Sequence, residues 1–283
     1  MDAFRVGLLS SLSANIITTV ILLITALLYA FTLGIKRKAL LRFLGLSSEC
    51  NKLIICTSSY SAFSVNPETQ ERLEQKTRSA ISVNEFLAFP ALDRWLSPLT
   101  KHSTFLEYLI NYIKPSIFRF ITINVEYIPS PAKIDNLPWS NCTLILIGGP
   151  VFNQGTMLYY SQNMCSMHLL TLENKIAVQI IRGKRANEIL GSNIDFDEYE
   201  VSRTKDIAII EKFHDHERNI NVIIAAGATS QGTKAAIHQL TNNWEKLYNR
   251  YKTKPFAICL ECANDKVDHN GYLDSTVLYA TDS

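Results

Sequence analysis

One long apolar stretch limits every other interpretation of this sequence. Gly7 to Ile35 is a run of 29 residues without a charged side chain, preceded by Arg5 and followed by Lys36. As an α-helix of about 1.5 Å per residue it would reach roughly 43 Å, which exceeds the ~30 Å of hydrocarbon in a bilayer. It lacks the short apolar core and the small-residue cleavage site of a secretory signal. Because unpaired backbone groups are costly in lipid, we predict one transmembrane helix.

Basic residues gather on the C-terminal side of this run. They are Lys36, Arg37, Lys38 and Arg42. Positive charge beside a membrane span stays on the cytoplasmic side. We therefore expect a span with its basic flank over residues 1–38, a neck over 39–52, and a cytoplasmic domain over 53–283. This layout is that of a single-pass protein of the inner membrane with its N-terminus outside.

Polar side chains follow one face of the predicted helix at alternating steps of four and three residues, which is a heptad pattern. The seam consists of Ser11, Asn15, Thr18, Leu22, Thr25, Tyr29 and Thr32, and every member except Leu22 carries a hydroxyl or an amide. Ser and Thr hydroxyls can bond to carbonyls of their own helix, which would leave a plain anchor. The alternative is a helix–helix contact in a homo-oligomer, with a tetramer favoured, or the wall of a pore. Asn15 favours association, because an amide in lipid needs a partner.

The charge balance of the remaining chain restricts its partners. Removing Asp2, Arg5 and the four flanking basic residues from the totals of 28 basic and 26 acidic residues leaves 23 basic and 25 acidic. Duplex nucleic acid needs many phosphate contacts, so no such partner is expected. A short anionic ligand in a shaped pocket remains compatible with this balance.

Two units after the span have the pattern of a parallel sheet. The apolar stretch 143–147 leads into Gly148 and Gly149, and the stretch 221–226 leads into a loop at 227–233 and a long amphipathic helix. Uninterrupted apolar strands followed by glycine and a helix are typical of βα units. We predict a Rossmann-like α/β domain with a mainly parallel sheet. Further strands are expected at 52–57, 118–128, 176–181, 207–213, 256–262 and 276–279, and helices at 83–96, kinked or split at Pro90, and at 105–113.

Ligands of open parallel sheets bind at the carboxyl ends of the strands. Glycine lets a backbone approach a ligand, and N–H groups at a helix start favour an anion. The candidate ligand-binding residues are Ser58, Ser59, Gly148, Gly149, Asn153, Gly227, Thr229, Ser230, Gln231, Gly232 and Thr233. Neither loop fits a Walker A or a GxGxxG pattern. The glycines could alternatively serve only to turn the chain.

No catalytic set or metal site is evident in the sequence, and no cofactor is predicted. The pair His214 and His216 lacks a third ligand, and Cys259 and Cys262 lack a second pair. On the cytoplasmic side we expect the six cysteines to be free thiols. Glu85 follows Ser82 with the spacing of a capping box, and capping is the simpler role. In the alternative interpretation Glu85 is a catalytic acid.

The combination of a membrane helix, a basic neck and the loops LILIGGP (144–150) and VIIAAGATSQGT (222–233) resembles the effectors of bacterial anti-phage nucleotide-signalling systems. The Hailong-type channel effectors are the nearest architecture, and the likeness covers the layout of the whole chain. It implies a domain that binds a nucleotide or short oligonucleotide and controls an oligomeric membrane pore. The domain also resembles nucleoside deoxyribosyltransferase-like folds, which implies a membrane-tethered enzyme, a transferase or hydrolase, that processes nucleosides or nucleotides. A membrane-anchored scaffold is the third possibility.

Overall fold

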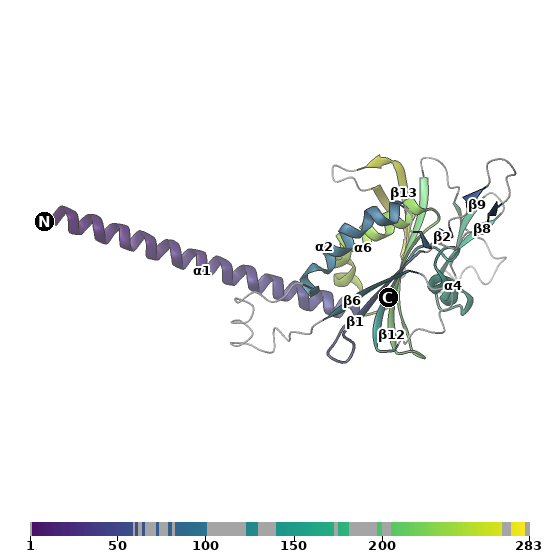
Figure 1. Cartoon of the computed structure of the whole chain (residues 1–283), viewed down its shortest axis with the longest axis horizontal. Helices are drawn as coiled ribbons and strands as arrows, with labels where there is room; N and C mark the ends of the chain where they lie inside the picture. Colours follow the sequence, from purple (N-terminus) through teal and green to yellow (C-terminus); the bar gives the residue numbers. More distant parts are fainter. Residues whose placement is uncertain are drawn as a thin grey trace.

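The computed structural model shows a long helix that projects from an α/β domain (Figure 1). It describes residues 2–58, 60–61, 64–65, 72–73, 79–80, 83–100, 123–129, 140–172, 175–180, 197–199, 205–267 and 273–280. The helix expected at 105–113 and the first residues of the strand expected at 118–128 lie outside these ranges.

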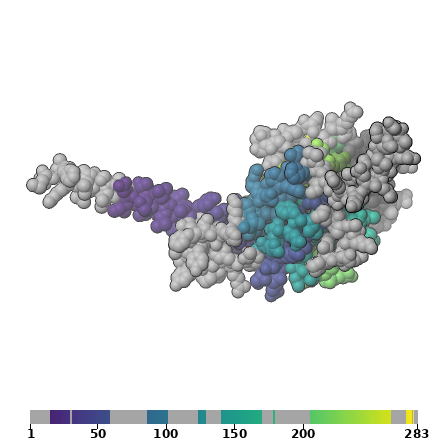
Figure 2. All heavy atoms as spheres, in the orientation of Figure 1, coloured from purple at the N-terminus to yellow at the C-terminus, as the bar shows by residue number. Residues whose placement is uncertain are grey.

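Helix α1 (Asp2–Leu44) is continuous through the apolar run and the basic flank that follows it. Its part from Asn15 to Leu44 is long and apolar enough to cross a membrane, with a mean hydropathy of 2.4 and none of its apolar window buried. A core helix of a soluble protein would be buried, whereas the apolar part of α1 after residue 15 stands clear of the domain (Figure 2). The helix predicted for this stretch is confirmed.

The last turns of α1 belong to the core of the domain. Leu40, Phe43 and Leu44 are at most 1% exposed. Gly45 ends the helix with a φ of 70°, and the Leu46 N–H donates to the Leu41 carbonyl at 2.8 Å. A glycine in this left-handed conformation is a common helix terminator. Full burial of each large side chain contributes roughly 1.5–3 kcal/mol. The helical part of the interval 39–52, expected to be a neck, is therefore packed against the domain, whereas residues 47–49 are exposed.

A seven-stranded mixed sheet forms the centre of the domain, in the order β14-β13-β11-β12-β7-β1-β6. Strands β6, β1, β7 and β12 pair in parallel, and β12, β11, β13 and β14 pair antiparallel. The strands are β1 (Lys52–Thr57), β6 (Asn124–Pro129), β7 (Cys142–Ile147), β11 (Lys205–Asp215), β12 (Ile220–Gly227), β13 (Phe256–Val267) and β14 (Leu273–Ala280). The α/β class is as predicted, whereas the parallel pattern covers only one half of the sheet.

Helices cover both faces of the sheet. The end of α1 packs with α2 (Val83–Thr100) and α6 (Ser230–Tyr251) on one face, and α4 (Gln154–Ser161) packs on the other (Figure 1). Successive strand residues alternate between the two cores. In β7, Ile145 and Ile147 face the first core, and Leu144 and Leu146 face the second. Strands buried on both faces explain the uninterrupted apolar runs in the sequence.

Helix α2 continues without a break through Pro90 and Pro98, so of the two expectations at Pro90, a kink or a split, the split does not occur. Proline removes one hydrogen bond to the carbonyl four residues earlier. Pro90 is exposed, and Phe86, whose carbonyl loses that bond, is 62% exposed. Water can therefore satisfy this carbonyl, and the helix continues.

The remaining strands of the described chain are short. A three-stranded sheet, in the order β10-β9-β8, consists of β8 (Met167–Leu172), β9 (Lys175–Ile180) and β10 (Asp197–Tyr199). Two two-stranded sheets pair β2 (Tyr60–Ser61) with β5 (Ser79–Ala80) and β3 (Ser64–Val65) with β4 (Arg72–Leu73). Only β9 among them coincides with an expected strand. Met167 and Leu169 of β8 join the core beside α4.

Candidate ligand site at the carboxyl edge of the sheet

The carboxyl ends of β1, β7 and β12 meet at one edge, as the predicted site requires. The hydroxyl of Ser58, which follows β1, donates to the Ile147 carbonyl at 3.1 Å. The Gly148 N–H donates to the Ala225 carbonyl of β12 at 3.0 Å. A Cβ on Gly149 would lie 3.3 Å from the Gly227 carbonyl oxygen, so the two glycine loops are in close contact.

Asn153 joins β1, β7 and α4. Its amide nitrogen donates to the Ile147 carbonyl at 2.9 Å and to the Cys56 carbonyl at 3.1 Å. Its Oδ1 accepts the N–H groups of Gly155 and Thr156 at the start of α4. The side chain is fully buried, and both of its polar atoms are bonded within the protein. Asn153 therefore acts as a helix cap that fixes the edge of the sheet.

The loop after β12 is closed by close backbone contacts. The Gly227 N–H donates to the Thr233 hydroxyl at 3.1 Å. A Cβ on Gly227 would lie 2.1 Å from the Thr233 nitrogen and 2.2 Å from the Gly232 carbonyl carbon. A Cβ on Gly232 would lie 2.7 Å from the Ile207 carbonyl oxygen. Both glycines are therefore required by packing inside the protein.

The start of α6 already holds an anionic group, the carboxylate of Asp206. Asp206 Oδ2 accepts the Gly232 N–H at 2.6 Å and also accepts the Thr229 hydroxyl. Its Oδ1 accepts the Ile207 N–H at 2.7 Å, and the side chain has no exposed surface. A helix N-terminus favours negative charge, and here Asp206 supplies it. Another anion at this helix start would have to displace Asp206.

Sequence reasoning missed Asp206 because strand direction was not evident. Asp206 lies at the beginning of β11, where a parallel sheet would place it at the opposite edge from the glycine loops. Strand β11 instead pairs antiparallel with β12, with Ala208 opposite Gly227. The beginning of β11 therefore lies beside the end of β12. The one available signal was the short connection 216–219 between the two strands, which is typical of a hairpin.

The other candidate residues contribute different groups. Thr229 is exposed and caps α6 by accepting the Gln231 N–H at 3.1 Å. Ser230 is half-buried, and the Oε1 of Gln231 is buried without a partner among the described residues. Ser59 lies outside the described ranges. Glu85 lies in the first turn of α2, and its side chain is not among those described.

The described residues include no group of three or more His, Cys, Asp or Glu side chains that could hold a metal ion. His214 and His216 contact each other edge to face at 4.8 Å, and His214 pairs with Asn221. All six cysteines are free, and five of them are buried. Burial raises the pKa of both Cys56 and Cys262 to about 12, so these two thiols stay protonated at neutral pH.

The seam of α1 is exposed from Asn15 onward, and the side chain of Ser11 is not among those described. Leu22 is 65% exposed and Tyr29 is 66% exposed. The Thr25 and Thr32 hydroxyls donate to the carbonyls of Ile21 and Tyr29, both at 2.8 Å. These two donors are therefore satisfied within the helix. Their oxygens can still accept a hydrogen bond from a neighbouring helix or from water.

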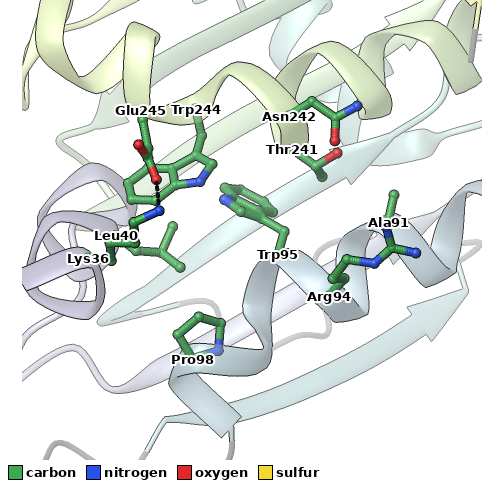
Figure 3. Close-up of a pocket in the computed structure, with 10 residues that line it drawn as sticks. All are labelled: Lys36, Leu40, Ala91, Arg94, Trp95, Pro98, Thr241, Asn242, Trp244 and Glu245. Carbon is green, nitrogen blue, oxygen red and sulfur yellow. Dashed lines mark ion pairs between the residues drawn. The ribbon is translucent and has the colours of Figure 1, made fainter. Parts of the chain in front are cut away.

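A second feature lies where α1 enters the domain, away from the carboxyl edge. The ammonium of Lys212 lies 5.0 Å from the centre of the Phe43 ring, and the side chain is 3% exposed. Its nitrogen has no hydrogen-bond partner among the described residues. Burial lowers the pKa of Lys212 to about 8. Nearby, α1, α2 and α6 line a hollow of about 210 Å³ (Figure 3).

Neither comparison of the sequence assigns a family. No protein-family model matches the chain, and no curated protein matches it.

Proposed function

We propose that the protein is a single-pass membrane effector whose domain senses a small ligand and controls the arrangement of its membrane helices. The observation that supports this proposal best is the attachment of α1. One uninterrupted helix leads from the apolar run into the core of the domain, where Phe43 and Leu44 are fully buried. A movement of the domain is therefore transmitted to the span without a flexible linker.

Polar contacts strengthen this attachment. The Thr143 hydroxyl at the start of β7 donates to the Leu44 carbonyl at 2.7 Å. The Asn221 amide at the start of β12 donates to the Gly45 carbonyl at 3.3 Å. These strands are the ones whose other ends form the carboxyl edge. An enzyme that needs only a tether has no need of this connection, so the effector interpretation is favoured over the anchored enzyme.

The basic residues after the apolar run place the domain on the cytoplasmic side of the inner membrane in this proposal. The seam from Ser11 to Thr32 then joins copies of α1, with a tetramer as the favoured assembly and a pore along its axis. The ligand is a nucleotide or short oligonucleotide, since the domain sequence has a net charge close to zero, whereas duplex nucleic acid needs many phosphate contacts from basic side chains. In a cell such an effector would serve anti-phage defence.

The test of the membrane part is ion flux. We expect wild-type protein to dissipate the membrane potential of cells that express it, measured with a voltage-sensitive dye. Replacing Asn15 and Thr25 by Leu should abolish this effect, because an apolar seam excludes water and loses its polar contacts between helices. The matched control replaces Ile17 and Ile24, both more than 50% exposed on α1, by Leu. Equal effects of the two double variants would remove the case for the seam.

The test of coupling is an insertion between Lys38 and Ala39. A glycine-rich insert breaks the helix, whereas an insert of about seven alanines adds roughly two helical turns and nearly preserves the facing of the seam. We expect the glycine insert to uncouple ion flux from the domain. The alanine insert should preserve the control of flux by the domain, and both variants should be expressed at the wild-type level. Full regulation with the glycine insert would reduce α1 to a tether. The ligand itself is identified by a separate experiment, which is mass spectrometry of the small molecules released when the purified protein is denatured.

A further inference from the structure

The hollow at the base of α1 is formed by three helices that meet where the apolar run ends. Lys36 and Leu40 come from α1, Arg94 and Trp95 from α2, and Trp244 and Glu245 from α6. Figure 3 shows these side chains around the Trp95 ring, with Lys36 on one side and Arg94 on the other. The hollow is therefore lined both by the helix that leaves the domain, α1, and by the two helices that cover this face of the sheet, α2 and α6.

The charges around the hollow favour an anionic ligand. Lys36 Nζ lies 3.0 Å from Glu245 Oε1, and both side chains are at least half exposed, so this pair is easily exchanged. Arg94 is exposed and forms no ion pair with the residues that the structure describes. Two cations and one carboxylate therefore line the hollow. An anion can use Arg94 directly and can compete with Glu245 for Lys36.

Trp95 provides a second, independent sign of a ligand. Its side chain is 6% exposed, and its indole N–H has no acceptor among the described residues. A buried donor without a partner costs free energy that a ligand oxygen can recover. The rings of Trp95 and Trp244 both pack on Phe43, with centroid distances of 6.4 and 6.2 Å. The aromatic wall is therefore held in place by the same residue that anchors α1.

The level of the hollow along α1, relative to the proposed membrane, indicates the chemistry of its ligand. Lys36 is the first charged residue after the apolar run, so the hollow lies at the level where that run would leave the hydrocarbon. Tryptophan is enriched at this level of a membrane because its ring is amphipathic. Basic pockets beside membrane helices bind the phosphate groups of anionic lipids. The groups that line the hollow match such a headgroup.

We propose that this hollow binds the phosphate-bearing headgroup of an anionic phospholipid. The phosphate pairs with the basic side chains, and oxygens of the headgroup accept from the indole N–H of Trp95. The bound lipid thereby fastens α1 to α2 and α6 at the membrane surface. This inference rests on the proposed membrane placement of α1, and it is independent of a pore or of a nucleotide ligand.

Tryptophan fluorescence can test the proposal directly, because two of the three tryptophans of the chain line the hollow. The full-length protein with Trp139 replaced by Phe, in detergent micelles, is titrated with phosphatidylglycerol. Parallel titrations use phosphatidylcholine, inorganic phosphate and glycerol phosphate. We expect a saturable change in emission with phosphatidylglycerol, and a linear or absent response to the other three.

Three substitutions distinguish a built site from general attraction to negative charge. Arg94→Gln should raise the half-saturating fraction of phosphatidylglycerol about tenfold, since a charge-assisted hydrogen bond is lost. Arg42→Gln also removes one positive charge, but from an exposed position of α1 that does not line the hollow. This variant should change the half-saturating fraction of phosphatidylglycerol less than about twofold. Glu245→Gln should lower it severalfold, because it frees Lys36 and removes a repelling carboxylate. Structural damage would not produce such a gain.

Each remaining outcome would overturn the proposal. Equal losses in the Arg94 and Arg42 variants would assign binding to diffuse charge. Saturation by glycerol phosphate or inorganic phosphate, without a preference for phosphatidylglycerol, would make a soluble phosphate the ligand. Flotation of wild-type protein with vesicles of equal parts phosphatidylcholine and phosphatidylglycerol checks membrane insertion separately. Failure of that control would refute the proposed membrane function, whereas insertion without a saturable titration would refute only the lipid site.

Discussion

The carboxyl edge of the sheet and the base of α1 differ in how their polar groups are satisfied. At the edge, Asn153 and Asp206 are fully buried, and all four of their side-chain oxygen and nitrogen atoms are bonded within the protein. At the base of α1, the indole of Trp95 and the ammonium of Lys212 are buried without hydrogen-bond partners among the described residues. At the edge, one buried atom, the Oε1 of Gln231, also has no partner among the described residues, but no cation or N–H donor is left unpaired there as Lys212 and Trp95 are at the base of α1.

This contrast suggests different roles for the two regions. Polar groups that bond to one another stabilise a fold, whereas buried groups without partners cost stability and often indicate a functional requirement. We therefore expect substitutions at the edge to affect stability strongly. Substitutions around the hollow should affect binding with little loss of stability, or even with a gain.

The largest effect is expected from Gly227→Ala. The added Cβ would lie 2.1 Å from the Thr233 backbone nitrogen, which cannot move without disturbing the start of α6. We expect a loss of about 3 kcal/mol or more, or failure to fold, measured by chemical denaturation. Gly149→Ala is the control, because its Cβ meets the Gly227 carbonyl oxygen at 3.3 Å and needs only a small adjustment. Equal stability of the two variants would show that the loop is open enough to receive a ligand.

Asp206→Ala should be the next most harmful change. It removes a buried carboxylate that accepts the Gly232 and Ile207 N–H groups and the Thr229 hydroxyl. We expect a loss of about 2 to 4 kcal/mol, because these donors are left without an acceptor at the start of α6. Asp93→Ala, which removes an exposed acceptor of the Tyr127 hydroxyl, should cost less than about 1 kcal/mol. If added phosphate restored the stability of the Asp206 variant, the helix start would be an anion site after all.

Lys212→Met should act in the opposite direction and stabilise the protein by about 1 to 3 kcal/mol at neutral pH, because it removes a buried ammonium without a hydrogen bond. The lowered pKa of about 8, against an ordinary value of 10.5, also predicts a pH dependence. Between these values the unfolded chain binds the proton and the folded chain does not. Stability of the wild type should therefore rise with pH across this window, and the rise should be absent in the variant.

Thermal melting from pH 7 to 10.5 measures both effects. Lys254→Met, at an exposed position after α6, is the control and should change neither the melting temperature nor its pH dependence by much. A wild-type protein whose stability falls steadily over this range would contradict the assignment to Lys212. A destabilised Lys212 variant would indicate that its contact with the Phe43 ring outweighs the cost of burial.

The smallest effect on stability is expected from Arg94→Gln. Arg94 is exposed and has no ion pair with the described residues, so the change in unfolding free energy should stay within about 0.5 kcal/mol. Calorimetry can check this in the same sample that is used for the lipid titration. A large loss of stability would assign Arg94 to the fold and would weaken the contrast between the two regions.

Local patterns in the sequence determined much of the architecture. The uncharged run before Lys36 specified α1, and apolar stretches such as 143–147 specified buried strands with helices on both faces. These features depend on neighbouring residues alone, through periodicity and the cost of unpaired backbone groups. The convergence of Ser58 with the two glycine loops also followed, because parallel strands end at the same edge.

Tertiary structure decided the features that depend on distant residues. The antiparallel direction of β11 brings Asp206 to the start of α6 at Ser230, which lies 24 residues later in the chain. From the sequence, this helix start was expected to be available to an anionic ligand. Packing of α1 against α2 and α6 turned an expected neck into part of the core and formed the hollow around Trp95. Both depend on strand pairing and helix packing between segments far apart in the chain. Local periodicity carries no information on such contacts, because it fixes which face of an element is apolar and not which other element covers that face.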